Sequence, residues 1–169
     1  MALVVVAGHL CVDLIPIISA ESAASESFLA PGRLSEADGL TIAPGGCVSN
    51  TGIALHKLGT PVRLAGRLGD DPIGRLTREV IASVHPALTQ DLEQVPGAAG
   101  AYTLVISPPG VDRTFLGFLG PNDTFSSAHV PEDLLRQADL FHLGYPPLLR
   151  MMYAEGGAEL ARLMRRAKE

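Results

Sequence analysis

The sequence predicts an α/β protein with a doubly wound, mainly parallel sheet and a small second layer of β-structure. Three observations predict this class. A valine-rich run lies at residues 3–7, strand-like and helix-like segments alternate from residue 62 onward, and some extended segments fall outside that alternation. Continuous apolar runs are typical of parallel strands that are buried on both faces, and the alternation indicates βαβ units. A chain of 169 residues can bury one substantial core.

The first 40 residues supply two strands and a long excursion. Residues 3–7 are expected to form a buried strand that ends at Gly8. Residues 12–18 form a second strand, and Pro16 predicts an edge position for it because proline cannot donate a ladder hydrogen bond. Residues 19–38 are rich in Ser, Ala and Glu, which predicts a loop.

A glycine pair separates the next strand from the first long helix. Residues 40–42 are expected to form a short strand, and Gly45 and Gly46 follow it closely. Asn50 opens a helix as its N-cap, and Gly59 closes that helix. Adjacent glycines let backbone amides approach a bound hydroxyl or anion, so the segment is either a tight turn with a cap or a small-molecule site.

The rest of the chain alternates strands and helices around one hairpin. The expected elements are a strand at 62–66, a helix at 73–83 capped by Asp70 and Asp71, a hairpin of strands at 101–107 and 113–119, a helix at 131–138, a strand at 140–143 and a last helix at 147–168 that Gly156 and Gly157 interrupt. We expect a partial α/β core of residues 1–13, 45–100 and 120–169, with β lid insertions at 14–44 and 101–119.

Composition narrows the function classes. The formal net charge is −5 and the cations are scattered, which excludes a nucleic-acid surface. Cys11 and Cys47 are too few for a disulfide scaffold and lack the spacing of a zinc site, and the five histidines show no metal-ligand spacing. No segment resembles a signal peptide or a membrane span. A cytoplasmic protein with a small-molecule partner, without a membrane or a metal ligand set, is expected.

Three motifs resemble the ribokinase-like (PfkB) family of carbohydrate kinases. They are Pro-Gly-Gly-Cys-Val-Ser-Asn-Thr-Gly at 44–52 continuing to Gly-Arg-Leu-Gly-Asp-Asp-Pro-Ile-Gly at 66–74, the strand at 4–8 followed by Asp13, and Asp-Arg-Thr-Phe at 112–115 followed by Gly-Pro-Asn-Asp at 120–123. The first of these is specific, and the likeness runs from about residue 3 to residue 145. The resemblance implies a doubly wound α/β domain whose sugar site a β-sheet lid covers.

The resemblance also implies phosphoryl transfer from ATP, with Mg²⁺, to a sugar or nucleoside hydroxyl. It assigns hydrogen bonds with substrate hydroxyls to Asp13, backbone amide contacts to Gly45 and Gly46, and a contact from the helix start to Asn50. Each of these residues also has a purely structural interpretation, as a turn cap, a tight turn or an N-cap. Arg113 on the hairpin is either a solvated surface residue or a weaker candidate for a lid or phosphate contact.

Two departures from the family concern the substrate, and one concerns catalysis. Cys11 stands where ribokinase-like members often carry asparagine, and Cys47 where ribokinases tend to carry lysine, which favours another polyol, a hexose phosphate or a nucleoside over ribose. Family members are about twice as long, and their Asn-x-x-Glu and Gly-Ala-Gly-Asp motifs have no match in residues 146–169. No catalytic residue is identifiable in this chain.

The sequence therefore predicts the N-terminal, sugar-binding portion of a carbohydrate kinase that lacks the ATP-binding and catalytic half and is inactive alone. The alternative is a non-catalytic sugar-binding or regulatory fragment. A third reading is a structural remnant whose unpaired sheet edge favours aggregation or pairing with another chain. A homodimer through the β lid is compatible with each of them.

Overall fold

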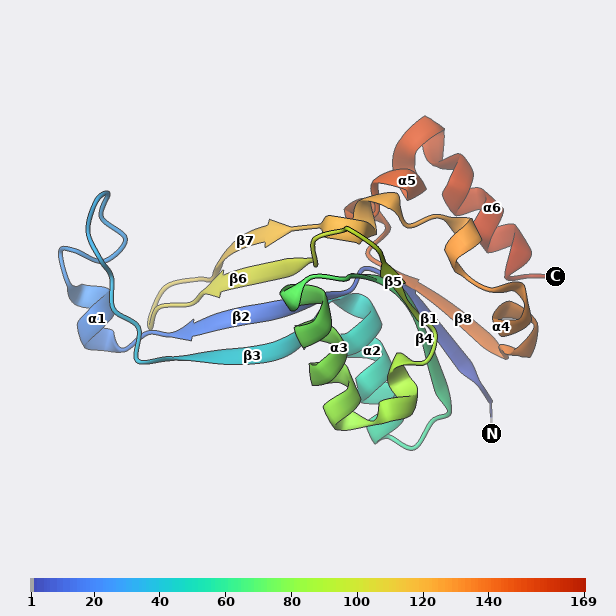
Figure 1. The fold of residues 1–169 in the computed structure, drawn as a ribbon, viewed down its shortest axis with the longest axis horizontal. Helices are drawn as coiled ribbons and strands as arrows, with labels where there is room; N and C mark the ends of the chain where they lie inside the picture. The colour runs from blue at the N-terminus through green and yellow to red at the C-terminus, as the bar shows by residue number, and fades with distance from the viewer. Residues whose placement is uncertain (1) are drawn as a thin grey trace.

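The computed structural model describes residues 2–169 and contains two four-stranded sheets (Figure 1). Sheet A is parallel, in the order β5-β4-β1-β8. Its strands are β1 Val4–Gly8, β4 Val62–Gly69, β5 Leu92–Val95 and β8 Leu140–Gly144. Sheet B has the order β3-β2-β6-β7 and consists of β2 Cys11–Ile17, β3 Gly39–Gly45, β6 Tyr102–Ile106 and β7 Thr114–Phe118. The predicted α/β class with a separate β-layer is confirmed.

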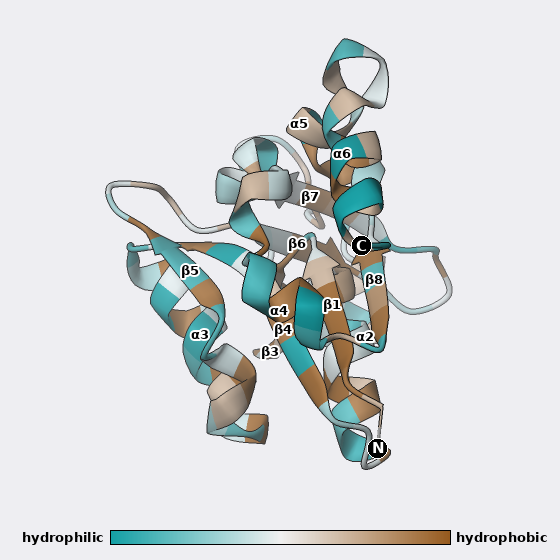
Figure 2. Cartoon of the chain, turned by 90° about the vertical axis from the view of Figure 1, so that its right-hand side faces the viewer, coloured by the Kyte–Doolittle hydropathy of each residue, from teal (hydrophilic) through white to brown (hydrophobic). Residues whose placement is uncertain are grey.

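Helices cover both faces of sheet A. They are α2 Gly46–Lys57, α3 Pro72–Val84, α4 Glu132–Gln137, α5 Arg150–Tyr153 and α6 Ala158–Arg166. The remaining helix, α1 Ala20–Ala24, lies away from sheet A (Figure 1). Val4 and Val6 of β1 pack into a cluster with residues of α2 and α3, whereas Val5 and Ala7 pack against α4, α5 and α6. This is why β1 is apolar along its whole length, and Figure 2 shows the hydrophobic colour concentrated on β1 and β8.

Sheet B extends away from the helical core, and the α1 segment lies at its far tip (Figure 1). The expected edge position of residues 12–18 is wrong, because β2 pairs with β3 on one side and with β6 on the other. The β6 pairing covers only Val12 to Leu14, whereas Pro16 is paired with Leu40 of β3. The proline therefore lies beyond the stretch where both sides of β2 are paired. Its lack of an N–H costs no hydrogen bond with β6 there.

Helix α2 begins five residues earlier than the sequence suggested, at Gly46 and not at Thr51. Gly45 is its N-cap and Gly46 its first residue, so the expectation that Asn50 opens and caps the helix is wrong. Gly46 has a φ of +83°, and this freedom of glycine lets the chain turn from β3 directly into the helix. The predicted end is confirmed, because Gly59 has a φ of +80° and donates its N–H to the His56 carbonyl.

Three further boundaries differ from expectation. The short strand at 40–42 is the middle of the longer β3, the predicted loop at 19–38 contains α1, and β5 was not predicted. The last predicted helix is broken as expected, since Glu155, Gly156 and Gly157 have positive φ values between α5 and α6. The predicted cap of α3 is confirmed, because Asp71 Oδ1 accepts the Gly74 N–H at 2.8 Å.

Candidate functional site

Three of the predicted site residues, Asp13, Gly45 and Gly46, gather where the chain passes from sheet A to sheet B. Strand β1 ends at Gly8, which is paired with Gly144 at the end of β8, and β2 starts at Cys11. The N-terminus of α2 reaches the same place, because the His9 carbonyl accepts the Val48 N–H at 3.1 Å. Open α/β sheets bind ligands at the carboxyl ends of their strands, so this is the expected location of a substrate.

Glycines leave this surface without side chains. A Cβ on Gly8 would lie 2.4 Å from the Gly144 oxygen, and one on Gly144 would lie 2.2 Å from Cys47 Sγ. A Cβ on Gly46 would lie 2.6 Å from the His9 carbonyl oxygen. Any larger residue at these three positions would have to displace backbone or a buried neighbour. We refer to Gly8, Gly45, Gly46 and Gly144 as the glycine floor.

Asp13 lies beside the glycine floor. Its carboxylate occupies the space next to Gly45, where a Cβ would be 2.2 Å from Asp13 Oδ1. Asp13 is paired with Ala43 of β3 and Thr103 of β6, so all three lie on the same face of sheet B. The structure thus brings Asp13, Gly45 and Gly46 together, as the family resemblance implied. A half-buried carboxylate beside bare backbone suits a ligand that offers hydroxyl groups.

The two thiols border Asp13 and the floor. The Cys11 thiol donates to Asp13 Oδ1 at 3.5 Å and lies 3.6 Å from Thr103 Oγ1, and the Cys47 thiol donates to the His9 carbonyl at 3.5 Å. Burial raises the pKa of Cys11 to about 12 and that of Cys47 to about 11. Both are therefore neutral at physiological pH and unsuited to nucleophilic attack. Residues 2–169 contain no group of three or more His, Cys, Asp or Glu placed to hold a metal ion.

His9 belongs to this cluster, although no motif in the sequence marks it. It is 5% exposed, and burial lowers the pKa of its ring to about 4. Its Nδ1 is buried without a hydrogen-bond partner among the described residues, and it faces Gly46. Its ring lies 6.2 Å from the ring of Tyr145. His9 is thus a neutral imidazole at physiological pH.

Asn122 was also missed as a positioning residue. Its side chain is fully buried, accepts the Leu10 N–H at 3.0 Å, and donates to the Leu10 and Leu119 carbonyls at 2.9 and 2.7 Å. These bonds fix the backbone at Leu10, in the connection between β1 and β2. They therefore also help to fix the direction of β2, the strand that carries Asp13. The signal was present in the Gly-Pro-Asn-Asp motif, whose asparagine precedes a buried Phe125.

The other two predicted residues, Asn50 and Arg113, make no hydrogen bond with Asp13 among the described residues. Asn50 is exposed and lines a shallow cavity with Pro44 and Lys57, and it makes no side-chain hydrogen bond within the described residues. Arg113 follows the β6–β7 turn, beyond the Ile106–Thr114 pair, whereas Asp13 is level with Thr103 near the other end of β6. The Arg113 guanidinium lies 5.4 Å from the centre of the Phe115 ring.

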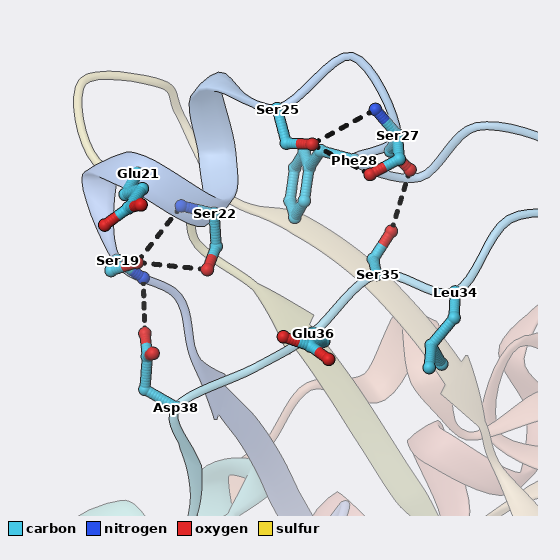
Figure 3. A pocket seen from close by; sticks show the side chains of 10 residues that line it. All are labelled: Ser19, Glu21, Ser22, Ser25, Ser27, Phe28, Leu34, Ser35, Glu36 and Asp38. Atoms are coloured by element: carbon cyan, nitrogen blue, oxygen red, sulfur yellow. Dashed lines mark hydrogen bonds between the residues drawn. The ribbon is translucent and has the colours of Figure 1, made fainter.

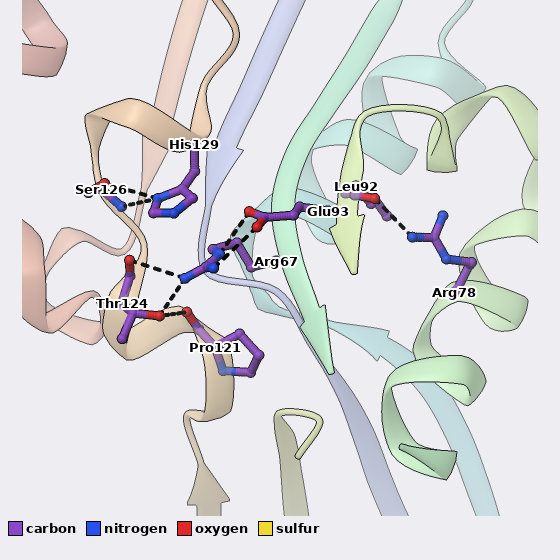
Figure 4. A network of polar contacts seen from close by, with 8 residues as sticks. All are labelled: Arg67, Arg78, Leu92, Glu93, Pro121, Thr124, Ser126 and His129. Carbon is purple, nitrogen blue, oxygen red and sulfur yellow. Dashed lines mark hydrogen bonds and ion pairs between the residues drawn. The ribbon is translucent and has the colours of Figure 1, made fainter. Parts of the chain in front are cut away.

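Two polar clusters lie outside the site. Arg67 of β4 donates to Glu93 of β5 and to Thr124, which ties the segment carrying Asn122 to sheet A (Figure 4). Burial, and the positive charge of Arg67, lower the pKa of the nearby His129.

The second cluster lines a cavity of about 580 Å³ within the α1 excursion (Figure 3). Its side chains are mostly serine hydroxyls and carboxylates, and they bond to one another and to the local backbone, as in the Ser19–Asp38 contact of 2.9 Å. These bonds give the excursion its shape. The described residues include no helix that is both long and apolar enough to cross a bilayer.

Comparison with known proteins links these features to one family. Residues 1–169 match the family described as pfkB family carbohydrate kinase. Fructokinase-2 of Solanum lycopersicum is 28% identical to this chain over 144 residues, which cover 84% of this chain and 40% of the relative. The chain thus spans about two fifths of the length of the curated relatives it matches.

Solved structures of low sequence identity have the same fold. An uncharacterized sugar kinase from Pyrococcus horikoshii superimposes with a TM-score of 0.72 at 18% identity, over 99% of this chain and 50% of that one. A ribokinase of Arabidopsis thaliana, solved with ribose and ATP, gives 0.68 at 20% identity, over 84% of this chain and 45% of that one. Sheet A, sheet B and their connections are therefore those of ribokinase-fold kinases.

Proposed function

Because this chain belongs to the pfkB family of carbohydrate kinases, we propose that it carries the sugar-binding part of an enzyme that phosphorylates a hydroxyl of a sugar or nucleoside with ATP. The observation that carries the proposal is the placement of Asp13 against Gly45, at the carboxyl end of β1 and beside the start of α2. A kinase that acts on a polyol needs an acceptor for several hydroxyls and a surface that the ring can approach closely, and this cluster supplies both.

Binding would proceed through complementary hydrogen bonds. A carboxylate has two oxygens and can accept bonds from two adjacent hydroxyls, which Asp13 would do from the face of sheet B. The backbone amides at the start of α2 would donate to a substrate oxygen, aided by the positive end of the helix. In this arrangement the residues of this chain bind and orient the sugar.

The family's reaction uses ATP and Mg²⁺, which supply the phosphoryl group and neutralise its charge. The described residues do not fit Mg²⁺, since they form no metal-holding cluster, and residues 146–169 contain no glycine-rich segment for phosphates. We therefore derive no transfer step from this chain. We propose that residues 1–169 alone bind sugar without turning over ATP, that Asn50 contacts the sugar from α2, and that Arg113 contributes only weakly.

A non-catalytic sugar-binding or regulatory fragment is the second candidate function. The observation that favours it is the Asp13 cluster itself, because a carboxylate beside bare backbone needs no nucleotide to bind hydroxyls. Cys11 and Cys47 are buried and reduced, which fits a reducing compartment, and we propose a cytoplasmic location.

Calorimetric titration tests the proposal. D-Fructose, D-ribose and adenosine are titrated into the purified chain, with Asp13→Asn as the variant and Asp112→Asn as its control, since Asp112 is exposed on the β6–β7 turn. We expect one of the three compounds to bind, Asp13→Asn to weaken it about tenfold or more, and Asp112→Asn to leave it unchanged. An affinity that is unchanged by Asp13→Asn would refute the proposed site.

A coupled assay with ATP, Mg²⁺ and the same compounds separates the two candidates. We expect no turnover by residues 1–169 in either case. If a longer chain that contains this one phosphorylates the bound sugar, the kinase is supported; if it binds without turnover, the regulatory fragment is supported. Robust turnover by residues 1–169 alone would contradict the proposed division between sugar binding and ATP chemistry.

We also propose that sheet B is a contact surface for a second copy of the chain. Its paired positions Ile42, Leu14, Leu104 and Leu116 form an aliphatic row across all four strands. Ile42 and Leu116 are 40% and 62% exposed at the two edges. Because neighbours along a strand point to opposite faces, this row lies on the face away from Asp13. Pairing of two copies through the row would leave the site accessible.

A further inference from the structure

Tyr145 has a backbone conformation that its sequence position disfavours. It is the first residue after β8, and its φ and ψ are +54° and +48°, in the left-handed region. Residues other than glycine rarely adopt this region, because Cβ approaches the carbonyl oxygen. Pro146 follows directly, and a proline shifts the residue before it toward extended conformations. A glycine or asparagine would satisfy this position at lower cost.

Local hydrogen bonding explains why the chain turns at residue 145, but it does not explain why this residue is a tyrosine. The Tyr145 carbonyl accepts the Leu148 N–H at 2.9 Å, a bond that any residue could make. The side chain is 53% exposed, and its hydroxyl has no hydrogen-bond partner among residues 2–169. A large aromatic ring is therefore exposed at a position whose left-handed backbone conformation favours glycine. Strain of this kind is concentrated at binding and catalytic sites.

The position of Tyr145 relates it to the glycine floor. Gly144, its neighbour in the chain, is paired with Gly8, and the Gly144 carbonyl accepts the His9 N–H at 3.5 Å. The Tyr145 ring lies 6.2 Å from the His9 ring, whose unpartnered Nδ1 faces Gly46. Contacts thus run from Asp13 through Gly45, Gly46 and His9 to Tyr145. The floor has a carboxylate at one end and an exposed aromatic ring at the other.

We propose that Tyr145 is a substrate-binding residue, whose ring packs against the apolar C–H face of the sugar while Asp13 binds its hydroxyls; this inference rests on the proposed function. Small-molecule sites combine a few polar groups that fix orientation with aromatic side chains that supply contact area. Tyrosine provides a large apolar face together with a hydroxyl, so it can cover a sugar ring and also bond to it. The Tyr145 ring already lies 6.2 Å from the ring of His9, whose Nδ1 faces Gly46 of the floor.

The test uses a matched pair of glycine substitutions. Tyr145→Gly removes the ring and accepts the left-handed backbone, and Glu155→Gly is the control, because Glu155 has a φ of +50° and lies between α5 and α6. Affinity for D-fructose, D-ribose and adenosine is measured by calorimetry and Tm by thermal unfolding. We expect Tm not to fall in either variant. Tyr145→Gly should lower the affinity for the bound compound about tenfold, and Glu155→Gly should leave that affinity unchanged.

Two outcomes overturn the inference, and they are distinguishable. If the unsubstituted chain binds none of the three compounds, the proposed function fails and this inference fails with it. If the unsubstituted chain binds a sugar and Tyr145→Gly binds it equally well, only the role of Tyr145 is refuted. Tyr145→Asn, which also tolerates the left-handed region, replaces Tyr145→Gly if that variant does not fold. Tyr145→Phe then separates the ring from the hydroxyl, and retained affinity supports packing by the ring.

Discussion

His9 is the residue that ties the site to the stability of the chain. Its carbonyl accepts bonds from the start of α2 and from the Cys47 thiol, while its ring is buried as a neutral imidazole. Burial of an imidazole without a charge partner disfavours the protonated form. Protonation of His9 therefore opposes folding.

The pH dependence of stability follows from the sign of this shift. The pKa of His9 falls from 6.5 to about 4 in the folded chain. Between these values the unfolded chain binds a proton that the folded chain does not, so the free energy of unfolding decreases as pH falls from about 6.5 to about 4. Urea unfolding at a series of pH values should show this decrease, and His9→Phe should reduce its slope by the contribution of about one proton. Parallel curves for the two proteins would contradict this assignment.

Single residues were the hardest level to predict from the sequence. Asp13, Gly45 and Gly46 were found because a spaced motif marks them, and the structure places them together. His9 and Tyr145 carry no motif, and their importance comes from burial and from backbone torsion angles, which only the folded chain has. Asn50 was misread because the glycine pair itself starts the helix, four residues before the N-cap that composition suggested.

At the scale of elements, the connection from β1 to β2 carries the site. The Asn122 side chain bonds to both the backbone N–H and the backbone carbonyl of Leu10. The segment of residues 120–124, which we call the clamp, therefore holds this connection in place. The two asparagines of the chain therefore have opposite environments, since Asn122 is buried and bonded and Asn50 is exposed within α2. They form a natural matched pair.

Alanine substitution at these two positions tests the clamp and the corrected start of α2. We expect Asn122→Ala to lower the free energy of unfolding by about 2 kcal/mol or more, because buried backbone groups lose their partners. Asn50→Ala should change it by less than about 0.5 kcal/mol, as an exposed site inside a helix would. A loss of ~1 kcal/mol at Asn50, measured by urea unfolding, would instead indicate a helix cap.

Elements with strong local signals were predicted well. The apolar run of β1, the capped α3, the β6–β7 hairpin and the break before α6 each follow from a pattern in the sequence. β5 was missed because Leu92–Val95 is short and half polar, and its pairing with β4 is decided by tertiary contacts. The interior position of β2 was missed because the residues around Pro16 do not show that β6, far away in the sequence, pairs with Val12 to Leu14.

At the scale of the whole molecule, sheet B projects from the core with apolar residues on both edges (Figure 1). If a second copy covers the aliphatic row, sedimentation velocity should show concentration-dependent self-association. Leu116→Lys, at the exposed edge of β7, should shift the chain toward monomer by placing a charge in the contact. Leu58→Lys is the control, because Leu58 is 82% exposed at the end of α2. Equal behaviour of both variants would argue against this surface.

The central claim is that a sugar binds between Asp13 and the glycine floor, and backbone amide shifts test it most directly. A chain of 17.7 kDa is suited to heteronuclear NMR with ¹⁵N labelling. During titration with D-fructose or D-ribose, we expect the amides of Gly45, Gly46 and Gly144 to shift together and saturably, while those of the α1 excursion stay in place. Shifts confined to the α1 excursion, or no shift at the floor at saturating sugar, would contradict the account.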